Sequence, residues 1–228
     1  MTTTNKILLG ILGIAVAGGI VSLAYFFGNT AGENTAQLND PTPVATVNGE
    51  AVTRGELNAQ IAQIAQNPQI QVPREGTEEH AQFERLVLDQ MINTRLFLKE
   101  AEARDLAPSE AEIEAEFARV LGQFESEAAF ESQLAAAGLS RADVREDIKE
   151  QLTVVAFRAH LKVENNVEAT EEEARALYER AVEEQGIEQS FEDIEEVVYA
   201  QVENLEIEQL IAALVQELRS EAEVEILI

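Results

Sequence analysis

The side chains best suited to acid–base chemistry are the two histidines, His80 and His160. His80 directly follows Glu78 and Glu79, and a histidine paired with a carboxylate is an ingredient of acid–base catalysis. The same residues open a predicted helix, where acidic side chains are favoured, so we interpret them as a solvated helix start. We expect His160, near the end of another predicted helix, to interact with the negative end of the helix dipole. No metal-binding spacing connects the two histidines.

The densest acidic patches are Glu171–Glu173 and a second group formed by Glu192, Asp193, Glu195 and Glu196. Neither patch has the Asp-x-Asp-x-Asp-Gly spacing of a calcium loop. We assign the first patch to a helix N-terminus, because negative charge is stabilised there. The second patch carries no ligand spacing of its own.

Other motifs that bring chemistry are absent from the sequence. It has no Gly-x-Ser-x-Gly, no Walker-type glycine loop and no dinucleotide fingerprint. It also has no cysteine, which excludes disulfides, thiol catalysis, thiolate metal sites and a lipobox anchor. We therefore predict no enzyme: no catalytic residue, no cofactor and no metal site.

The net charge of the sequence limits the classes of partner that it can bind. The formal net charge is −27 and the pI about 4.3, so an approach to phosphate backbones is repulsive and nucleic acid is not an expected partner. Most of the acid is glutamate on predicted helices, which favours a solvated surface over the alternative of a specific surface for basic clients. A saline habitat is another explanation of this acidity. The chain has 228 residues, and the part outside the predicted membrane segment has the length of one ordinary domain.

The elements that position these side chains begin with a hairpin at residues 44–53. Asn48 and Gly49 tolerate positive φ, so they favour a type I′ turn between two short strands. Thr53 and Glu56 then have the spacing of a capping box, which predicts that a helix starts at once.

A series of capped helices follows. The first is predicted from about Arg54 to Gln66, because Pro68 disfavours helix before it, and a loop covers residues 67–76. The next runs from Thr77 to about Arg104 and is predicted to be the most buried. Its apolar residues are Phe83, Leu86, Val87, Leu88, Met91, Ile92, Leu96, Phe97 and Leu98. Further helix starts are predicted at Ser109 with Glu112, Ser126, Ser140 with Asp143, Thr170 with Glu173, and Ser190, with a stop at Gly138. Apolar stripes comprise Val144, Ile148, Leu152 and Val155, and then Leu210, Ile211, Leu214, Val215 and Leu218.

The last residues predict a strand. Val224, Ile226 and Ile228 alternate with glutamates, which is typical of a strand with one buried face. A lone strand cannot satisfy its backbone hydrogen bonds, and residues 44–53 hold the other strand candidates. We therefore expect the two ends of the segment 44–228 to meet.

Three blocks in this order resemble the SurA-type periplasmic chaperone domain: the hairpin, residues 86–101, and residues 108–162. The resemblance implies a mainly α fold, a multi-helix chaperone domain with a small sheet, closed by a C-terminal helix and strand. Many relatives insert a parvulin prolyl isomerase module, with a cluster of histidines, after the helix that corresponds to Thr170–Val182. Here about 25 residues separate Arg180 from Glu206, which is too few for that module, and neither histidine lies among them.

The first residues predict a membrane anchor. Residues 7–28 carry no charge and match the ~20 residues that cross a bilayer. Tyr25, Phe26 and Phe27 lie at its far end, where aromatic side chains favour the membrane interface, and Lys6 before the run predicts a cytoplasmic N-terminus over residues 1–6. A polar linker over 29–43 and the domain 44–228 then lie outside the bacterial inner membrane, on the periplasmic side. The alternative is a signal peptide cleaved near Ser22-Leu23-Ala24, which gives the same compartment.

The resemblance implies an ATP-independent chaperone that binds unfolded or newly exported polypeptides. Alternatives are a prolyl isomerase of parvulin-related type and a dedicated assembly subunit of a membrane complex. Seven phenylalanines are candidates either for a client-binding groove or, for most of them, for the core. They are Phe83, Phe97, Phe117, Phe124, Phe130, Phe157 and Phe191. The sequence assigns no client-binding residue and no oligomeric state.

Overall fold

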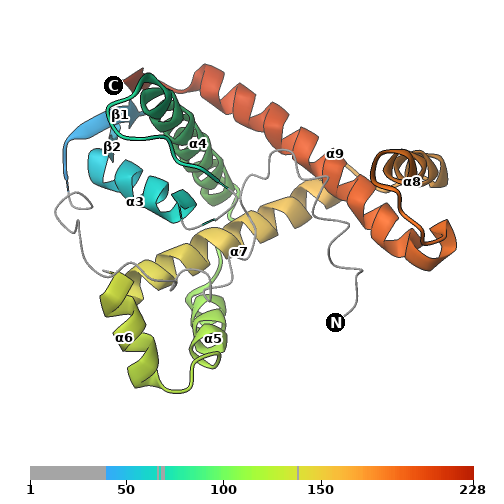
Figure 1. Cartoon of the computed structure of the whole chain (residues 1–228), viewed down its shortest axis with the longest axis horizontal. Helices are drawn as coiled ribbons and strands as arrows, with labels where there is room; N and C mark the ends of the chain where they lie inside the picture. Colours follow the sequence, from blue (N-terminus) through green and yellow to red (C-terminus); the bar gives the residue numbers. More distant parts are fainter. Residues whose placement is uncertain (1–39, 66, 68–69, 138) are drawn as a thin grey trace. The chain divides into compact units, whose positions relative to one another are not determined.

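The computed structural model describes residues 40–65, 67, 70–137 and 139–228 (Figure 1). The predicted anchor 7–28 and the predicted helix stop Gly138 lie outside these residues. Within the described ranges no helix is both long and apolar enough to cross a bilayer. This part of the chain is mainly helical with one small sheet, as the sequence predicts.

The elements follow one another closely along the chain. The strands are β1 (Pro43–Val47), β2 (Glu50–Thr53) and β3 (Val224–Ile226). The helices are α3 (Arg54–Ala65), α4 (Glu78–Ala103), α5 (Glu110–Leu121), α6 (Glu127–Ala137), α7 (Arg141–Glu164), α8 (Glu171–Gln185) and α9 (Phe191–Glu221).

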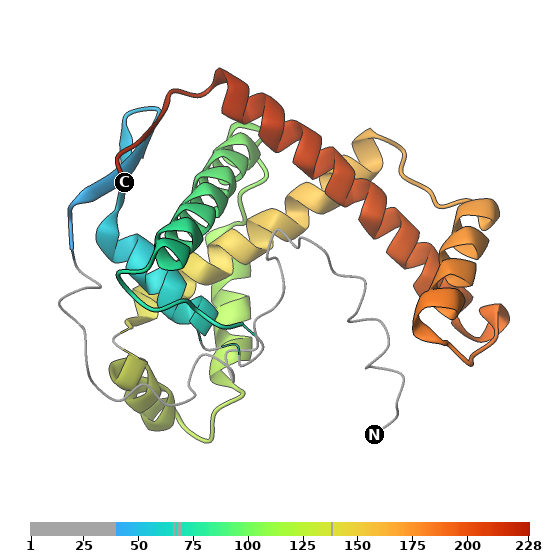
Figure 2. The same ribbon diagram turned by 45° about the horizontal axis from the view of Figure 1, so that its top comes forward.

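The sheet joins the hairpin to the end of the chain. Asn48 and Gly49 have φ of 50° and 83°, the positive pair that a type I′ turn requires. β3 pairs antiparallel with β1, with Val47 opposite Val224, and the strand order is β2-β1-β3. Figures 1 and 2 both show the C-terminus beside the hairpin. The expected meeting of the two ends is confirmed.

Side-chain caps start the helices where the sequence predicts them. In α5 the Ser109 hydroxyl accepts from the N–H of Glu112, whose carboxylate accepts from the N–H of Ser109 at 2.8 Å. Thr170 and Glu173 form the same reciprocal box at α8. These bonds satisfy backbone donors that a helix start leaves unpaired. The caps at Thr53 with Glu56, Thr77, Ser126, Ser140 with Asp143, and Ser190 with Asp193 are also present.

Contacts divide the described residues into two compact units, one of residues 40–156 with 215–228 and the other of residues 157–214. The first unit contains two hydrophobic cores. The one under the sheet, which we name the sheet core, centres on α4, in agreement with the predicted burial of this helix. Its buried residues are Val44, Ala45, Val47, Val52, Leu57, Val87, Leu88, Ile92 and Leu96.

The other core of this unit, the α5–α6 core, joins α5 and α6 to the start of α7 (Figure 1). Phe117 and Phe130 meet edge to face with ring centroids 5.7 Å apart, a favoured aromatic geometry. The Arg145 guanidinium lies 4.2 Å from the centre of the Phe117 ring. The buried residues are Ile113, Phe117, Val120, Phe130, Leu134, Val144 and Ile148.

Residues 157–214 have a core of their own, formed by α8 and the first part of α9. Leu177 and Phe191 are buried there, and the hydroxyl of Tyr178 donates to the carbonyl of Gln189 at 2.7 Å. That bond ties α8 to the short loop before α9.

Two apolar residues of the predicted helices that were expected to be buried are exposed. Leu86 is 68% exposed because neighbours cover α4 along Val87, Leu88 and Ile92 rather than around its whole circumference. Val155 is 60% exposed, because the buried side of α7 at this point carries Val154 instead. The sequence pattern shows which residues are apolar, but not how far neighbouring elements reach around a helix.

Ile226, predicted on the buried face of the last strand, is 45% exposed. Val224 and Ile228 of the same alternation do pack on the sheet core. β3 has a neighbour on one side within the described residues, and there Ile226 lies opposite the small side chain of Ala45, whereas Val224 lies opposite Val47.

Candidate functional site

Both histidines make local helix contacts. His80 donates its backbone N–H to the Thr77 hydroxyl at 3.2 Å, as part of the α4 cap. His160 lies near the end of α7, where its Nε2 is 3.7 Å from a carboxylate oxygen of Glu164 and its ring stacks on Phe157. The geometry therefore places His80 in a helix start, as the sequence predicts, and His160 on the surface near the end of α7.

The first acidic patch occupies the start of α8, as predicted. The Glu173 carboxylate accepts from the hydroxyl and from the backbone N–H of Thr170, and these two bonds lower the pKa of Glu173. Glu171 pairs with Arg175 at 2.9 Å. The charges of this patch therefore serve the helix itself.

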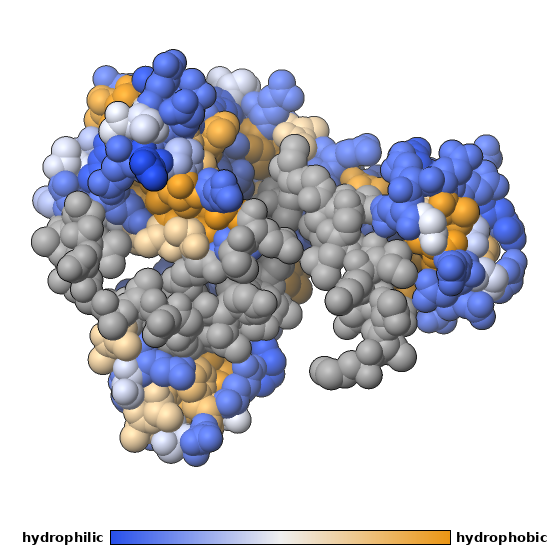
Figure 3. Space-filling model, viewed as in Figure 1, coloured by the Kyte–Doolittle hydropathy of each residue, from blue (hydrophilic) through white to orange (hydrophobic). Residues whose placement is uncertain are grey.

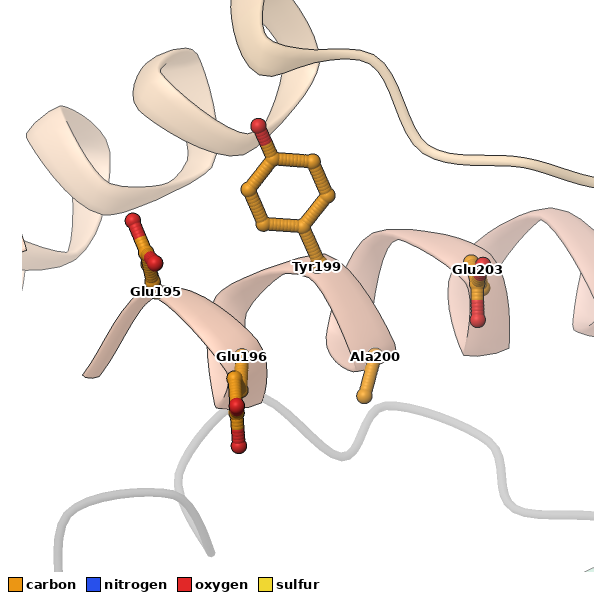
Figure 4. A pocket seen from close by; sticks show the side chains of 5 residues that line it. All are labelled: Glu195, Glu196, Tyr199, Ala200 and Glu203. Carbon is orange, nitrogen blue, oxygen red and sulfur yellow. The ribbon is translucent and has the colours of Figure 1, made fainter. Parts of the chain in front are cut away.

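The second acidic patch lies on α9, where a surface hollow of about 420 Å³ is lined by Glu195, Glu196, Tyr199, Ala200 and Glu203. Figure 4 shows Tyr199 on the opposite side of the helix from Glu196 and Ala200. Tyr199 packs against the core of residues 157–214, and Glu203 pairs with Lys162 at 2.5 Å. Within the described ranges no cluster of histidine and acidic side chains has the geometry to hold a metal ion.

The candidate phenylalanines belong to the cores. Phe97, Phe117, Phe130, Phe157 and Phe191 are buried. Phe83 packs half-buried on the sheet core, and Phe124 does so on the α5–α6 core. The sequence-based expectation that most of them form the interior is confirmed, so a client-binding surface has to come from other side chains.

Aliphatic side chains supply the exposed apolar surface instead. Figure 3 shows hydrophobic residues as separate patches among hydrophilic ones on the face in view. The exposed residues are Ile70, Leu86, Val155, Ile226 and Leu227 in the first unit, and Val163 and Val197 in residues 157–214. Sequence analysis missed this set, because apolar residues at helical spacing are indistinguishable from core residues before neighbours are known.

Basic side chains are mostly taken up by ion pairs. Lys99 meets Glu50 at 2.6 Å and Arg219 meets Asp89 at 2.5 Å. Acidic residues outnumber basic ones by 43 to 16, so many carboxylates are left without a cation. Further pairs join Arg54 to Glu84, Arg95 to Glu56, Arg145 to Glu114, Lys149 to Glu102, and Arg158 to Glu208.

One carboxyl stands out electrostatically. Partial desolvation, followed by the carboxylates of Asp143 and Glu146, raises the pKa of Asp147 on α7 to about 6. This group therefore titrates just below neutral pH, unlike the capping glutamates, whose pKa values are lowered by hydrogen bonds.

The position at which the resemblance implies an inserted module is a short connection here. Residues 186–190 separate α8 from α9, and Gly186 has a φ of 67° that ends α8 with a tight left-handed turn. The interval from Arg180 to Glu206 is filled by the end of α8 and the first half of α9. Within the described residues the chain contains no parvulin domain.

Comparison with known proteins shows the family of the chain. A model of the SurA-like N-terminal domain matches residues 2–158. The chain is 22% identical over 175 residues to the foldase protein PrsA of Clostridium perfringens. That alignment covers 72% of this chain and 51% of the relative, so the chain spans about half the length of the protein that it matches.

Proposed function

Because the chain belongs to the SurA-like N-terminal domain family, we propose that it is an ATP-independent chaperone that holds unfolded or newly exported polypeptides. The observation that carries this proposal is the family match over residues 2–158, on a helical scaffold whose described part has no parvulin domain. Binding without covalent chemistry is what such a scaffold offers.

The proposed mechanism uses exposed aliphatic side chains on a strongly acidic surface. Unfolded chains expose apolar area, and burying it against residues such as Leu86 and Val155 contributes roughly 25 cal/mol per Å². Leu86 lies on α4 and Val155 on α7, so each contact is small and weak, and a client is released easily. The net charge of −27 keeps the loaded complex soluble.

We further propose that residues 7–28 anchor the protein in the bacterial inner membrane, with the domain 44–228 on the periplasmic side. The uncharged run after Lys6 supports this location, and the family match begins at residue 2 and so includes the run. An anchored holder is positioned to meet polypeptides as they leave the membrane.

Suppression of aggregation tests the chaperone proposal. A chemically denatured acidic client and a denatured basic client are diluted into buffer with the full chain in detergent micelles, and light scattering is followed without ATP. We expect near-stoichiometric suppression for both clients, because apolar area drives the binding. Suppression of the basic client alone, or of neither client, contradicts the proposal.

The foldase name of the relative favours a second candidate, a prolyl isomerase of parvulin-related type. Proline isomerisation limits refolding on a scale of tens of seconds. A holder slows or leaves unchanged this phase, whereas an isomerase accelerates it at catalytic amounts. Acceleration at one chain per many clients replaces the chaperone proposal with this one.

The remaining alternative is a dedicated assembly subunit, which predicts other binding partners than a general chaperone does. Purification from solubilised membranes after crosslinking separates the two binding functions. A general holder brings down many sub-stoichiometric proteins, and an assembly subunit brings down one fixed set.

A further inference from the structure

The outer side of β3 is a free sheet edge among the described residues, where β1 is its one partner. Two hydrogen bonds fix which groups face inward: Leu227 N–H donates to the Val44 carbonyl at 2.9 Å, and Asn48 N–H donates to the Glu223 carbonyl at 2.8 Å. Antiparallel strands alternate hydrogen-bonded and non-hydrogen-bonded pairs. The N–H and C=O groups of Val224 and Ile226 therefore point outward, away from β1.

Side chains give this edge two different faces. Ile226 lies opposite Ala45, which is fully buried, and on the same face Val224 packs on the sheet core. Ile226 itself is 45% exposed, so it is the outer rim of that apolar face. The other face carries the exposed carboxylates of Glu223 and Glu225.

From this arrangement we propose that the outer edge of β3 binds an extended polypeptide segment in which apolar residues alternate with basic residues. The backbone of such a segment pairs with Val224 and Ile226 and extends the sheet by one strand. Its apolar side chains pack beside Ile226, and its basic side chains lie beside Glu223 and Glu225. This inference rests on the proposed function and specifies one surface on which a client docks.

Charge complementarity selects this occupant over a second copy of the chain. Two β3 edges that pair with each other bring glutamates of the same face together, between proteins that each carry a net charge of −27. Short, charged edge strands are a known means of preventing self-association. The same carboxylates attract a segment with lysine or arginine at alternate positions.

The decisive variant is Ile226→Pro. The Ile226 N–H takes no part in the β1–β3 ladder, so proline removes an outward donor and obstructs the edge while the internal hydrogen bonds remain. Ile226→Ala is the matched control, because it trims the side chain and keeps the donor. The double variant Glu223→Lys with Glu225→Lys tests the charge independently of any change in the backbone.

Binding is measured by fluorescence anisotropy of short labelled peptides added to the full chain in detergent micelles. The probe is an alternating Lys-Val peptide of about eight residues, with an alternating Glu-Val peptide as its opposite. We expect Ile226→Pro to weaken binding of the Lys-Val peptide at least about tenfold, and Ile226→Ala to weaken it about threefold. The double lysine variant should shift the preference to the Glu-Val peptide.

Circular dichroism melting shows whether each variant remains folded. If Ile226→Pro unfolds the protein, the double lysine variant decides, since its substituted side chains are exposed. Unchanged Lys-Val binding in a folded Ile226→Pro variant, or an unchanged preference in the double variant, overturns the inference. A dimer of the native chain that Ile226→Pro dissociates in ultracentrifugation also overturns it, because a second copy then occupies the edge.

Aggregation suppression separates this inference from the proposed function. One outcome is that the native chain suppresses aggregation while both variants bind the two peptides as the native chain does. In that case the edge proposal alone fails. If the native chain neither suppresses aggregation nor binds either peptide, the chaperone function itself fails.

Discussion

The sheet core and the α5–α6 core lie in the same compact unit, yet their contacts span different distances along the sequence. Residues from the chain end contribute to the sheet core and not to the buried part of the α5–α6 core. In the sheet core, Val47 on β1 faces Val224 on β3, so residues from the two ends of the segment 44–228 have to meet. The buried residues of the α5–α6 core all lie between Ile113 and Ile148. Closing a long loop costs more entropy than closing a short one, so the sheet core depends on distant residues and the other does not.

This contrast suggests a division of labour. The α5–α6 core is held by neighbours in sequence and is expected to form early and locally. The buried residues of the sheet core lie between Val44 and Leu96, and the chain end completes this core with Val224 and Ile228. The same chain end carries the β3 edge that we propose as a docking surface. The proposed binding edge lies on β3, so it is present only when β3 has paired with β1.

Removal of residues 223–228 is expected to have the largest effect. The sheet core loses the packing of Val224 and Ile228 together with the β1–β3 hydrogen bonds, a loss of about 4 kcal/mol in the free energy of unfolding. Hydrogen exchange should accelerate in β1 and β2 while amides of α5 and α6 keep their protection. Glu225→Ala, which leaves the strand in place, is the control.

Equal loss of protection in α5 and α6 after this truncation contradicts the comparison. It would show that the two cores unfold as one cooperative unit in spite of their different contact ranges.

Phe130→Ala tests the opposite direction. Phe130 is fully buried and meets both Phe117 and Phe124 edge to face, so its replacement by alanine should cost about 3 kcal/mol. Urea denaturation measures the loss, and hydrogen exchange should now accelerate in α5 and α6 while β1 stays protected. Phe124→Ala, at a half-buried position, is the matched control and should cost less.

Sequence patterns predicted the local parts of the two cores well, and also those of residues 157–214. Capping boxes at Ser109 and Thr170, and the Asn48-Gly49 turn, depend on residues within four positions of one another, and all three are present. The return of the last strand was also predictable, because an isolated strand needs a partner and the hairpin was the available one.

The solvent exposure of individual side chains was less predictable, and the candidate binding surfaces depend on it. Leu86, Val155 and Ile226 have the spacing of core residues, but each faces a side that no element covers within the described residues. Coverage depends on where distant elements end, which a periodic pattern does not encode. The free edge of β3 could be inferred only after the strand order was known.

Loss of a helix cap should have a smaller effect, of similar size in the two cores. Ser109→Ala removes the α5 capping box, and Thr53→Ala removes the one that joins β2 to α3. Each should cost about 1 kcal/mol, since the capped N–H groups are left to water. Thermal melting measures the change, and Ser109→Asn, which keeps an acceptor, should restore most of it. A loss at Thr53 several times that at Ser109 would show that the sheet core also depends on its local caps.

Asp147→Asn should have the smallest effect, and its sign depends on pH. The pKa of Asp147 in the folded protein, about 6, exceeds its ordinary value of 3.8, so protonation favours the folded state. The stability from this group is fully present below pH 3.8 and is lost as the pH rises through about 6. Asparagine should therefore stabilise the protein at pH 7, by less than about 1 kcal/mol because the side chain is exposed to solvent.

Melting temperatures at pH 7 and pH 5 check this prediction. The native chain should gain stability on acidification, and Asp147→Asn should gain less, while Glu179→Gln on α8 removes the same charge from an exposed position and serves as control. Because Asp147 neighbours the buried Ile148, the gain should reach α5 and α6 in hydrogen exchange before it reaches β1. A gain spread evenly over β1 and α5 would instead indicate that acidification acts through the overall charge of −27, since a field of that kind is not confined to one core.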